Sequence, residues 1–148
     1  MSAPSDMDIQ VPITSDADLA RVRQQVREAA VKAGFGLVQQ TKVVTAASEL
    51  ARNTLVHGGG GRMEMSERPG LGGAVELRLR FCDDGPGIAN VEQALTDGWT
   101  SGNGMGLGLG GARRLVHEFS LETTPGRGTT VTISAWSTPT PPPQGAGW

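Results

Sequence analysis

Two pairs of segments in the second half of the chain alternate apolar and polar residues, and each pair is joined by a short turn rich in glycine and proline. The first pair covers 62–68 and 75–81, on either side of the sequence PGLGG. The second covers 121–124 and 129–135, on either side of PGRG. Alternation with period two is typical of strands with one buried face, and turns this short join antiparallel neighbours. We therefore expect two β-hairpins.

Two longer segments in the first half carry the apolar period of amphipathic helices. The first helix is predicted over 16–33, where Ser15 and Asp18 approximate a capping box. The second is predicted over 38–57 and ends at a run of four glycines. An edge strand is expected over 9–13 and a third helix over 112–119.

Strands occur in groups, and the helices are too few for a series of alternating strand and helix units. The pattern therefore predicts an α/β (α+β) two-layer sandwich, in which helices cover one face of a mixed or antiparallel sheet. The length of 148 residues is that of one domain. We place this domain at 9–136, between a flexible leader at 1–8 and a proline-rich tail at 137–148 that we expect to be disordered.

Composition excludes several classes of function. The formal net charge is −2 with no block of like charge, which argues against binding to nucleic acid or to an anionic membrane surface. Cys82 is the only cysteine, so the chain has no internal disulfide or CxxC metal site, and we expect a core thiol. There is no signal-like N-terminal segment and no apolar run long enough to span a membrane, so we expect a cytoplasmic protein.

Three polar residues recur every four positions in the second predicted helix: Glu49, Asn53 and His57. This spacing places a carboxylate, an amide and an imidazole along one helix face, with neighbouring Cβ atoms about 6 Å apart. Such a row can form a site. It is also the pattern of a solvated face closed by a histidine at the negative helix end, and this helix alone favours that interpretation.

Two glycine-containing segments follow the strands. In DDGPGI, at 83–88, an acidic pair directly follows an apolar strand, which leaves a carboxylate beside a backbone that a ligand can approach; an ordinary turn is the alternative. In GNGMGLGLGG, at 102–111, a glycine string runs into a helix and presents N–H groups to an anion such as phosphate. No strand directly precedes its GxGxxG pattern, and the chain contains no Walker A sequence.

In this order, the segments resemble the motifs of the Bergerat-fold (GHKL) ATP-binding domains, the superfamily of histidine kinases, gyrase B-type ATPases, Hsp90-type chaperones and MutL proteins. ELARNTLVHG resembles the N-box, DDGPGI the G1 box, GMGLGLGG the G2 box and GRGTTVTI the closing strands. The resemblance covers 11–135. Within the superfamily, TKVVTAASELARN and DGWTSGNGMGLGLGGARRLVHEF are similar to the RsbT-type serine/threonine switch kinases of bacterial stress signalling.

The resemblance implies a site for ATP and Mg²⁺. Asn53 would hold Mg²⁺ against the triphosphate through its amide oxygen, and Glu49 would act as the catalytic base that accepts the hydroxyl proton of the incoming serine or threonine. Asp83 would accept a hydrogen bond from the adenine amino group. Three more residues are implied near the adenine ring. Gly85 and Gly87 would let the loop pass close to the ring, and Thr129 would support Asp83 and the adenine, directly or through water.

The segment 89–103 corresponds to the ATP lid of these domains. It contains no Lys or Arg, so Arg52, Arg113 or a partner residue would have to supply a cation near the γ-phosphate. The implied phosphate contacts are Thr100, Ser101, Gly102, Gly104, Met105, Gly106, Leu107 and Gly108.

The implied function is an ATP-dependent serine/threonine protein kinase that phosphorylates a STAS-domain antagonist in a partner-switching stress-signalling module. The alternative is an anti-sigma-factor kinase of the RsbW type, or a nucleotide-gated binding module that sequesters a sigma factor or activates a phosphatase. The resemblance thus allows a PPM-type phosphatase or a sigma factor as a further partner, and it is compatible with a dimer of this chain. No nucleic acid or membrane partner is expected.

Overall fold

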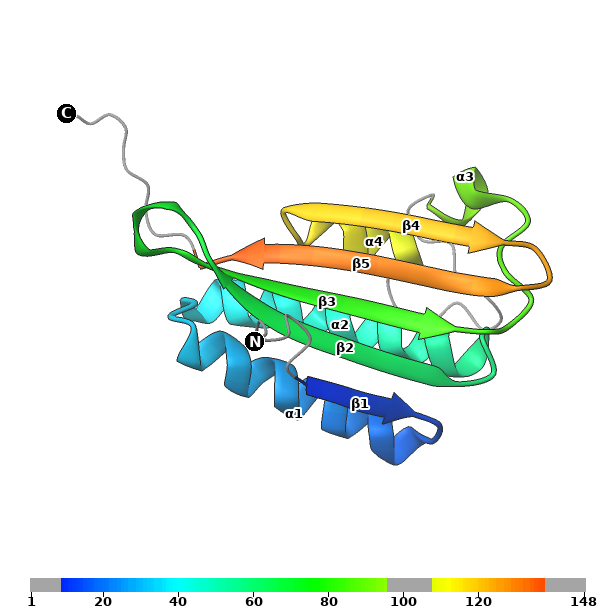
Figure 1. The fold of residues 1–148 in the computed structure, drawn as a ribbon, viewed down its shortest axis with the longest axis horizontal. Coiled ribbons are helices and arrows are strands. Elements are labelled where there is room, and N and C mark those ends of the chain that lie inside the picture. The colour runs from blue at the N-terminus through cyan, green and yellow to red at the C-terminus, as the bar shows by residue number, and fades with distance from the viewer. Residues whose placement is uncertain (1–8, 96–107, 138–148) are drawn as a thin grey trace, which may run out of the picture.

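The sheet of this computed structural model, which describes residues 9–95 and 108–137, has the strand order β1-β2-β3-β5-β4 (Figure 1). Every pair of neighbouring strands in it is antiparallel. The strands are β1 (Ile9–Ile13), β2 (Gly61–Pro69), β3 (Val75–Asp83), β4 (Glu118–Thr124) and β5 (Gly128–Trp136). The predicted hairpins are therefore confirmed as β2-β3 and β4-β5.

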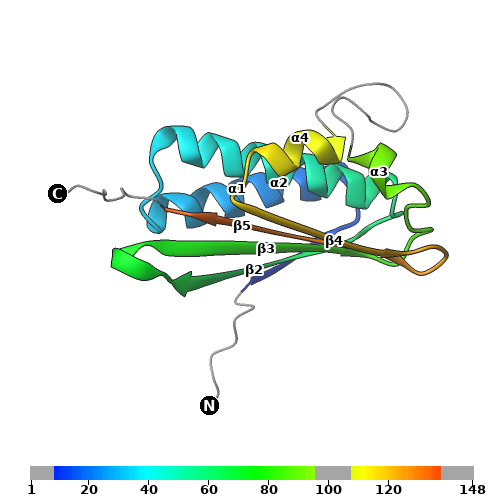
Figure 2. The ribbon, with the colours of Figure 1, turned by 90° about the horizontal axis from the view of Figure 1, so that it is seen from above.

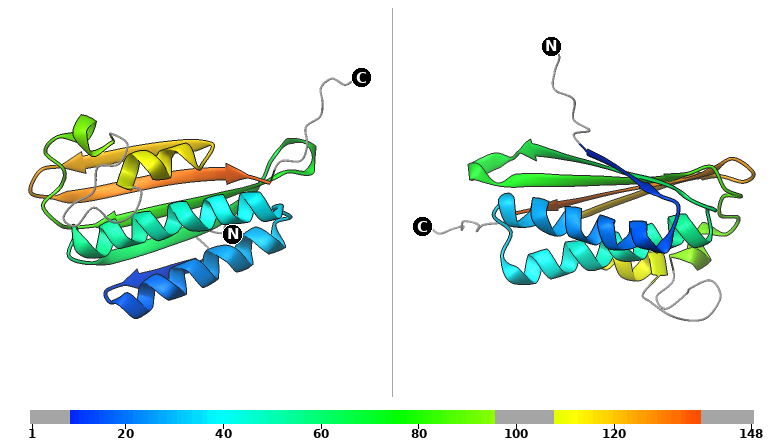
Figure 3. Two further views of the ribbon diagram at one scale, coloured as in Figure 1. Left: turned by 180° about the vertical axis from the view of Figure 1, so that it is seen from behind. Right: turned by 90° about the horizontal axis from the view of Figure 1, so that it is seen from below.

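The helices cover one face of this sheet, as the views from above and from behind show (Figures 2 and 3). They are α1 (Asp16–Lys32), α2 (Leu37–Val56), α3 (Val91–Ala94) and α4 (Gly108–Arg114), and a short 3-10 turn, η1 (Leu71–Gly73), lies in the β2-β3 connection. The predicted two-layer sandwich is confirmed. Within the described ranges, no helix combines the length and the apolar character needed to cross a membrane.

The core lies between the helices and the inner face of the sheet. Register aligns Met65 of β2 with Leu79 of β3 and Ile133 of β5, and all three side chains are buried. The helices cover this row with small and branched residues, among them Val22, Val26, Val43, Ala47 and Leu50. Close packing of this layer fixes how α2 is rotated on the sheet.

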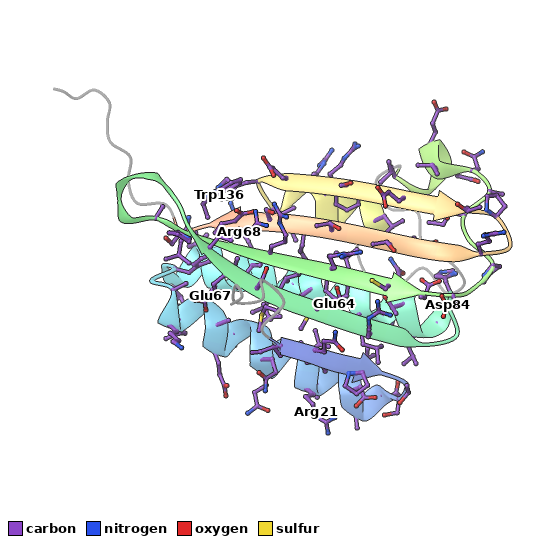
Figure 4. All side chains as sticks on the ribbon, in the orientation of Figure 1. Arg21, Glu64, Glu67, Arg68, Asp84 and Trp136 are labelled. Carbon is purple, nitrogen blue, oxygen red and sulfur yellow. The ribbon has the colours of Figure 1, made fainter. Side chains whose placement is uncertain are left out.

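The outer face of the sheet carries polar and charged side chains (Figure 4). Glu64 accepts a hydrogen bond from Arg62 Nε at 2.8 Å and lies 3.6 Å from Arg80 Nη1. Cys82 is buried, but it pairs with Arg62 across the sheet and lies on this outer face. Side chains alternate between the two faces of a strand, and Cys82 follows the inward-facing Phe81. The thiol is therefore not part of the core between helices and sheet.

The predicted helix over 112–119 is wrong in its second half. In the structure α4 ends at Arg114, and β4 begins at Glu118. Phe119 pairs with Ile133 of β5 on the inner face of the sheet. The apolar residues of a helix end and of the strand that follows it can also be spaced three and four apart. Periodicity alone therefore could not distinguish one continuous helix from a helix followed by a strand.

The predicted capping box at the start of α1 is also wrong. Ser15 is the N-cap residue, but its side chain makes no capping hydrogen bond. The Asp18 carboxylate instead accepts hydrogen bonds from the backbone N–H and the hydroxyl of Thr14, at 2.8 and 3.0 Å. These two bonds, together with the nearby guanidinium of Arg21, hold the pKa of Asp18 below its usual value. The ionised carboxylate therefore links the first turn of α1 to the residue that follows β1.

The substitution Asp18→Asn tests this link. Because the native pKa is lowered, the contribution of Asp18 to stability is present at neutral pH and is lost as pH falls through that pKa. We expect Asp18→Asn to lower the melting temperature at pH 7, and the difference from wild type to shrink below pH 3.8. Circular dichroism melts over a pH series measure this. The exposed Asp16→Asn is the control, and a pH-independent loss in Asp18→Asn would contradict the assignment.

Candidate functional site

A cavity of about 370 Å³ opens at one end of the sandwich, between the C-terminal half of α2, the end of β3, the start of β5, the segment after β3 and the start of α4. Its walls are largely apolar, with a few polar groups among them. The described lining residues are Leu50, Asn53, Thr54, His57, Gly58, Phe81, Asp83, Pro86, Gly87, Ile88, Ala89, Asn90, Gln93, Leu109, Thr129 and Val131. This combination is typical of a small-molecule site.

Asp83, the last residue of β3, contributes a half-buried carboxylate to this cavity. Its Oδ1 accepts a hydrogen bond from Gly85 N–H at 2.9 Å. Burial raises the pKa of Asp83, and the backbone N–H groups of Gly85 and Thr129 oppose that shift without cancelling it. The surroundings of the carboxylate therefore disfavour its charge, and a ligand that donates a hydrogen bond to it would favour the ionised form.

Gly58 lies directly against the Asp83 side chain. A Cβ atom at Gly58 would collide with the carboxyl carbon of Asp83, and a Cβ atom at Gly85 would lie 2.7 Å from the Gly58 Cα. Both positions therefore require glycine for the loop after α2 and the loop after β3 to meet. This contact places the carboxylate at the base of the cavity.

Thr129 faces the same cavity from β5, opposite Asp83 in the strand register. Its hydroxyl lies 2.9 Å from the hydroxyl of Thr123, which also accepts the N–H of Ile88 at 2.8 Å. The pair of threonines thus ties the segment after β3 to the β4-β5 hairpin. The backbone N–H of Thr129 donates a hydrogen bond to Asp83 and lowers the pKa of that carboxyl.

Glu49 and Asn53 lie one turn apart on α2, and the structure gives them different surroundings. Asn53 lines the cavity. Glu49 is partly buried, and its Oε1 accepts a hydrogen bond from the N–H of Gly108 at 3.3 Å. Gly108 is the first residue of α4 and has a φ of 72°, a conformation that favours glycine. The carboxylate is therefore held beside the start of the helix that follows the glycine string.

Several predicted phosphate contacts lie outside the described residues: Thr100, Ser101, Gly102, Gly104, Met105, Gly106 and Leu107. Among the predicted residues that are described, Asn53, Asp83, Gly87 and Thr129 line the cavity, while Gly85 and Glu49 lie next to it.

Sequence reasoning missed most of the apolar walls and favoured a solvated role for His57. That residue lines the cavity, and burial lowers the pKa of its imidazole although the Asp83 charge acts in the opposite direction. The signal for His57 was present in its four-residue spacing from Asn53. Leu109, Ile88 and Gln93 carried no comparable signal, because their positions depend on loop geometry.

The cavity has few groups for an anion or a metal. Among its described lining residues there is no Lys or Arg, and Arg52 and Arg113 are both exposed. The described part of the chain also has no group of three His, Cys, Asp or Glu residues arranged to hold a metal ion. A metal here would need a ligand that brings its own oxygen atoms, with the amide of Asn53 as one protein donor.

Comparison with known proteins identifies similar sequences. The profile of the histidine kinase-, DNA gyrase B- and HSP90-like ATPases matches residues 38–139. Over 126 residues, the chain is 37% identical to the serine/threonine-protein kinase RsbT of Bacillus subtilis (strain 168), which covers 85% of this chain and 94% of that protein.

Two solved structures share the fold. The RsbU and RsbW domains of Rv1364c from Mycobacterium tuberculosis match with a TM-score of 0.57 and 20% identity, over 86% of this chain and 31% of that one. The chain thus spans about a third of that protein's structure. The SiaB-SiaC complex from Pseudomonas aeruginosa matches with a TM-score of 0.55 and 13% identity, over 88% of this chain and 91% of that one.

The substitution Asp83→Asn tests the electrostatics of the cavity without a ligand. Because burial raises the native pKa, the ionised carboxylate destabilises the fold at neutral pH, and this cost disappears as pH falls and the group is protonated. We expect Asp83→Asn to melt at a temperature equal to or above that of wild type at pH 7. The two melting temperatures should converge at about pH 4, near the ordinary pKa of an aspartate. Calorimetric melts over a pH series measure this. A variant that melts well below wild type at pH 7 would contradict the account.

Proposed function

The chain belongs to the histidine kinase-, DNA gyrase B- and HSP90-like ATPase family, and on that premise we propose that it is an ATP-dependent serine/threonine protein kinase of a partner-switching module. Its proposed substrate is a serine or threonine on a STAS-domain antagonist. The observation that carries the proposal is the arrangement of three groups in the site: a partly buried carboxylate at Asp83, an amide at Asn53, and a second carboxylate at Glu49 beside the start of α4.

Asp83 is the proposed recognition group for adenine. Its carboxylate lines the cavity, and burial raises its pKa, so a ligand that presents an N–H would stabilise the ionised form; the adenine amino group is such a donor. Leu50, Phe81, Ile88 and Val131 supply apolar walls for a flat ring. The loop contact between Gly58 and Gly85 fixes where that ring can lie.

The proposed phosphate end lies where α2 meets α4. Asn53 would bind Mg²⁺ through its amide oxygen, since hard cations prefer oxygen and usually keep waters and substrate phosphates as their other ligands. When bound, Mg²⁺ would supply charge neutralisation to the transferred phosphoryl group. The donor present fits this role, because the Asn53 side chain lines the cavity and offers a neutral oxygen to a hard cation.

Glu49 is the proposed general base. Its carboxylate is held by the Gly108 N–H at the start of α4, one helical turn from Asn53. A proton acceptor is needed next to the transferred group, because a serine or threonine hydroxyl must lose its proton as it attacks. Glu49 and Asn53 thus divide two tasks, proton acceptance and metal binding, between adjacent turns of α2.

A second candidate function is a nucleotide-gated binding module, in which nucleotide sets the conformation and phosphoryl transfer is weak. One observation favours it: the described lining of the cavity lacks a Lys or Arg for the γ-phosphate, and the segment 89–103 lacks one as well. Cations at that position normally stabilise the charge that develops during transfer. The two functions differ in whether Glu49 is required.

Variants of Glu49 and Asn53 should fail in different ways. Asn53→Ala should weaken Mg²⁺-ATP binding and transfer together, because it removes a metal ligand. Glu49→Gln should leave nucleotide affinity near wild type and slow transfer by roughly 10²-fold or more, which is the usual contribution of a positioned base. Calorimetry for affinity and single-turnover phosphorylation of a STAS-domain protein from the same organism separate the two effects.

The matched control is Glu122→Gln, an exposed glutamate on the outer face of β4, which should behave as wild type. If Glu49→Gln phosphorylates at the wild-type rate, Glu49 is not the base and the nucleotide-gated module is favoured. If wild type binds ATP but does not transfer to any STAS-domain protein of the organism, the kinase proposal fails.

A further inference from the structure

A second cavity, of about 250 Å³, lies at the opposite end of α2 from the candidate nucleotide site. We call it the far pocket and define it by Phe35, Gln39, Lys42, Arg114, His117 and the end of β5 at Trp136. Lys42 and Asn53 are eleven positions apart on α2, which corresponds to roughly 17 Å along the helix axis. Figures 1 and 3 place the end of β5 and the turn between α1 and α2 at this same end of the molecule.

The rim of the far pocket is held by defined polar contacts. The Trp136 backbone N–H donates to His117 Nδ1 at 3.1 Å, and the two rings meet edge to face with centroids 5.2 Å apart. Gln39 Nε2 donates to the Trp136 carbonyl at 3.5 Å, which ties α2 to the end of β5. Phe35 is only 4% exposed and forms an apolar wall. A ligand would therefore meet a largely preformed pocket.

The charge of the far pocket is of one sign. Lys42 and Arg114 line it, and none of its described lining residues is acidic. Lys42 makes no ion pair with any residue in the part of the chain that the structure describes. A cationic pocket on a chain of formal charge −2 is complementary to an anionic group.

An exposed apolar patch adjoins the far pocket. Val31, Leu37 and Val38 are 56%, 73% and 67% exposed, and they are three of the four large apolar side chains that stand out as exposed in the described ranges. We call them the corner patch, because they flank the turn between α1 and α2. Val38 lies one turn before Lys42 on α2, so the patch continues the pocket along the helix. Exposed apolar side chains gathered beside a pocket mark an interaction surface.

We propose that the far pocket and the corner patch together bind a protein segment that carries aspartate or glutamate next to large apolar side chains. The acidic group would pair with Lys42 in the pocket whose positive charge Arg114 increases, and the apolar side chains would cover Val31, Leu37 and Val38. A small anionic metabolite would fill the pocket but leave the patch exposed, so the observations favour a peptide. This site is separate from the nucleotide cavity, and the inference does not depend on the proposed kinase activity.

The test uses the full chain and fluorescence anisotropy. The probes are short labelled peptides that combine aspartate with leucine in varied order, together with a matched panel in which asparagine replaces every aspartate. We expect acidic peptides to bind with a Kd below about 100 µM, and their asparagine counterparts to bind at least about tenfold more weakly. If no acidic peptide binds more tightly than its asparagine counterpart, the proposal is wrong.

Charge-reversal variants locate the site. Lys42→Glu and Arg114→Glu should each weaken binding of the acidic peptides by about tenfold or more, and Lys42→Glu should gain affinity for peptides with lysine in place of aspartate. Arg23→Glu, an exposed arginine on α1 two helical turns before Val31, is the matched control and should bind as wild type. Thermal melts and ATP affinity confirm that each variant is folded. Binding that survives both reversals would overturn the proposal.

Three further outcomes would also overturn it. If the full chain binds no acidic peptide but a chain ending at Ser137 does, residues 138–148 and not a partner occupy the pocket. If Val38→Asp converts a dimer to a monomer in light scattering, a second copy of the chain covers the patch. If phosphatidylglycerol vesicles bind while the acidic peptides do not, the surface recognises a membrane.

Discussion

The burial of one face of α2 against the sheet sets the rotation of that helix, and the candidate site depends on this rotation. Val43, Ala47 and Leu50 are buried in the core, so the adjacent row of the helix faces the start of α4 and the nucleotide cavity. Glu49 and Asn53 belong to that row. A change in core packing that turned α2 by a few tens of degrees would separate both groups from the cavity, since each residue covers about 100° of the helix.

The burial of the Asp83 carboxylate is the feature on which the proposed recognition of adenine depends. Burial disfavours the ionised carboxylate more than the N–H groups of Gly85 and Thr129 favour it, so the pKa of Asp83 is raised. Gly58 allows the carboxylate to occupy this place, because any larger residue at position 58 would displace it.

Much of the architecture followed from periodicity, because strands of period two and helices of period 3.6 bury one face each. The exceptions have local causes. Asp18 bonds to Thr14 in place of a capping box, and Phe119 belongs to a strand, where the same apolar spacing fits both structures. Motif order was sufficient to place Asp83 and Asn53 on one cavity. The engagement of Glu49 with the start of α4 depends on how the helices pack, which no local pattern encodes.

The central claim is that Asp83 recognises the adenine amino group, and a comparison of ATP with inosine triphosphate tests it most directly. Inosine triphosphate has an oxygen in place of that amino group and a hydrogen on N1, whereas its ribose and triphosphate are those of ATP, so the triphosphate and the metal contribute equally to both affinities. Calorimetry with wild-type protein in the presence of Mg²⁺ should give an affinity for ATP more than about tenfold higher, because a buried carboxylate would face an acceptor in place of a donor. Equal affinities for the two nucleotides would contradict the account.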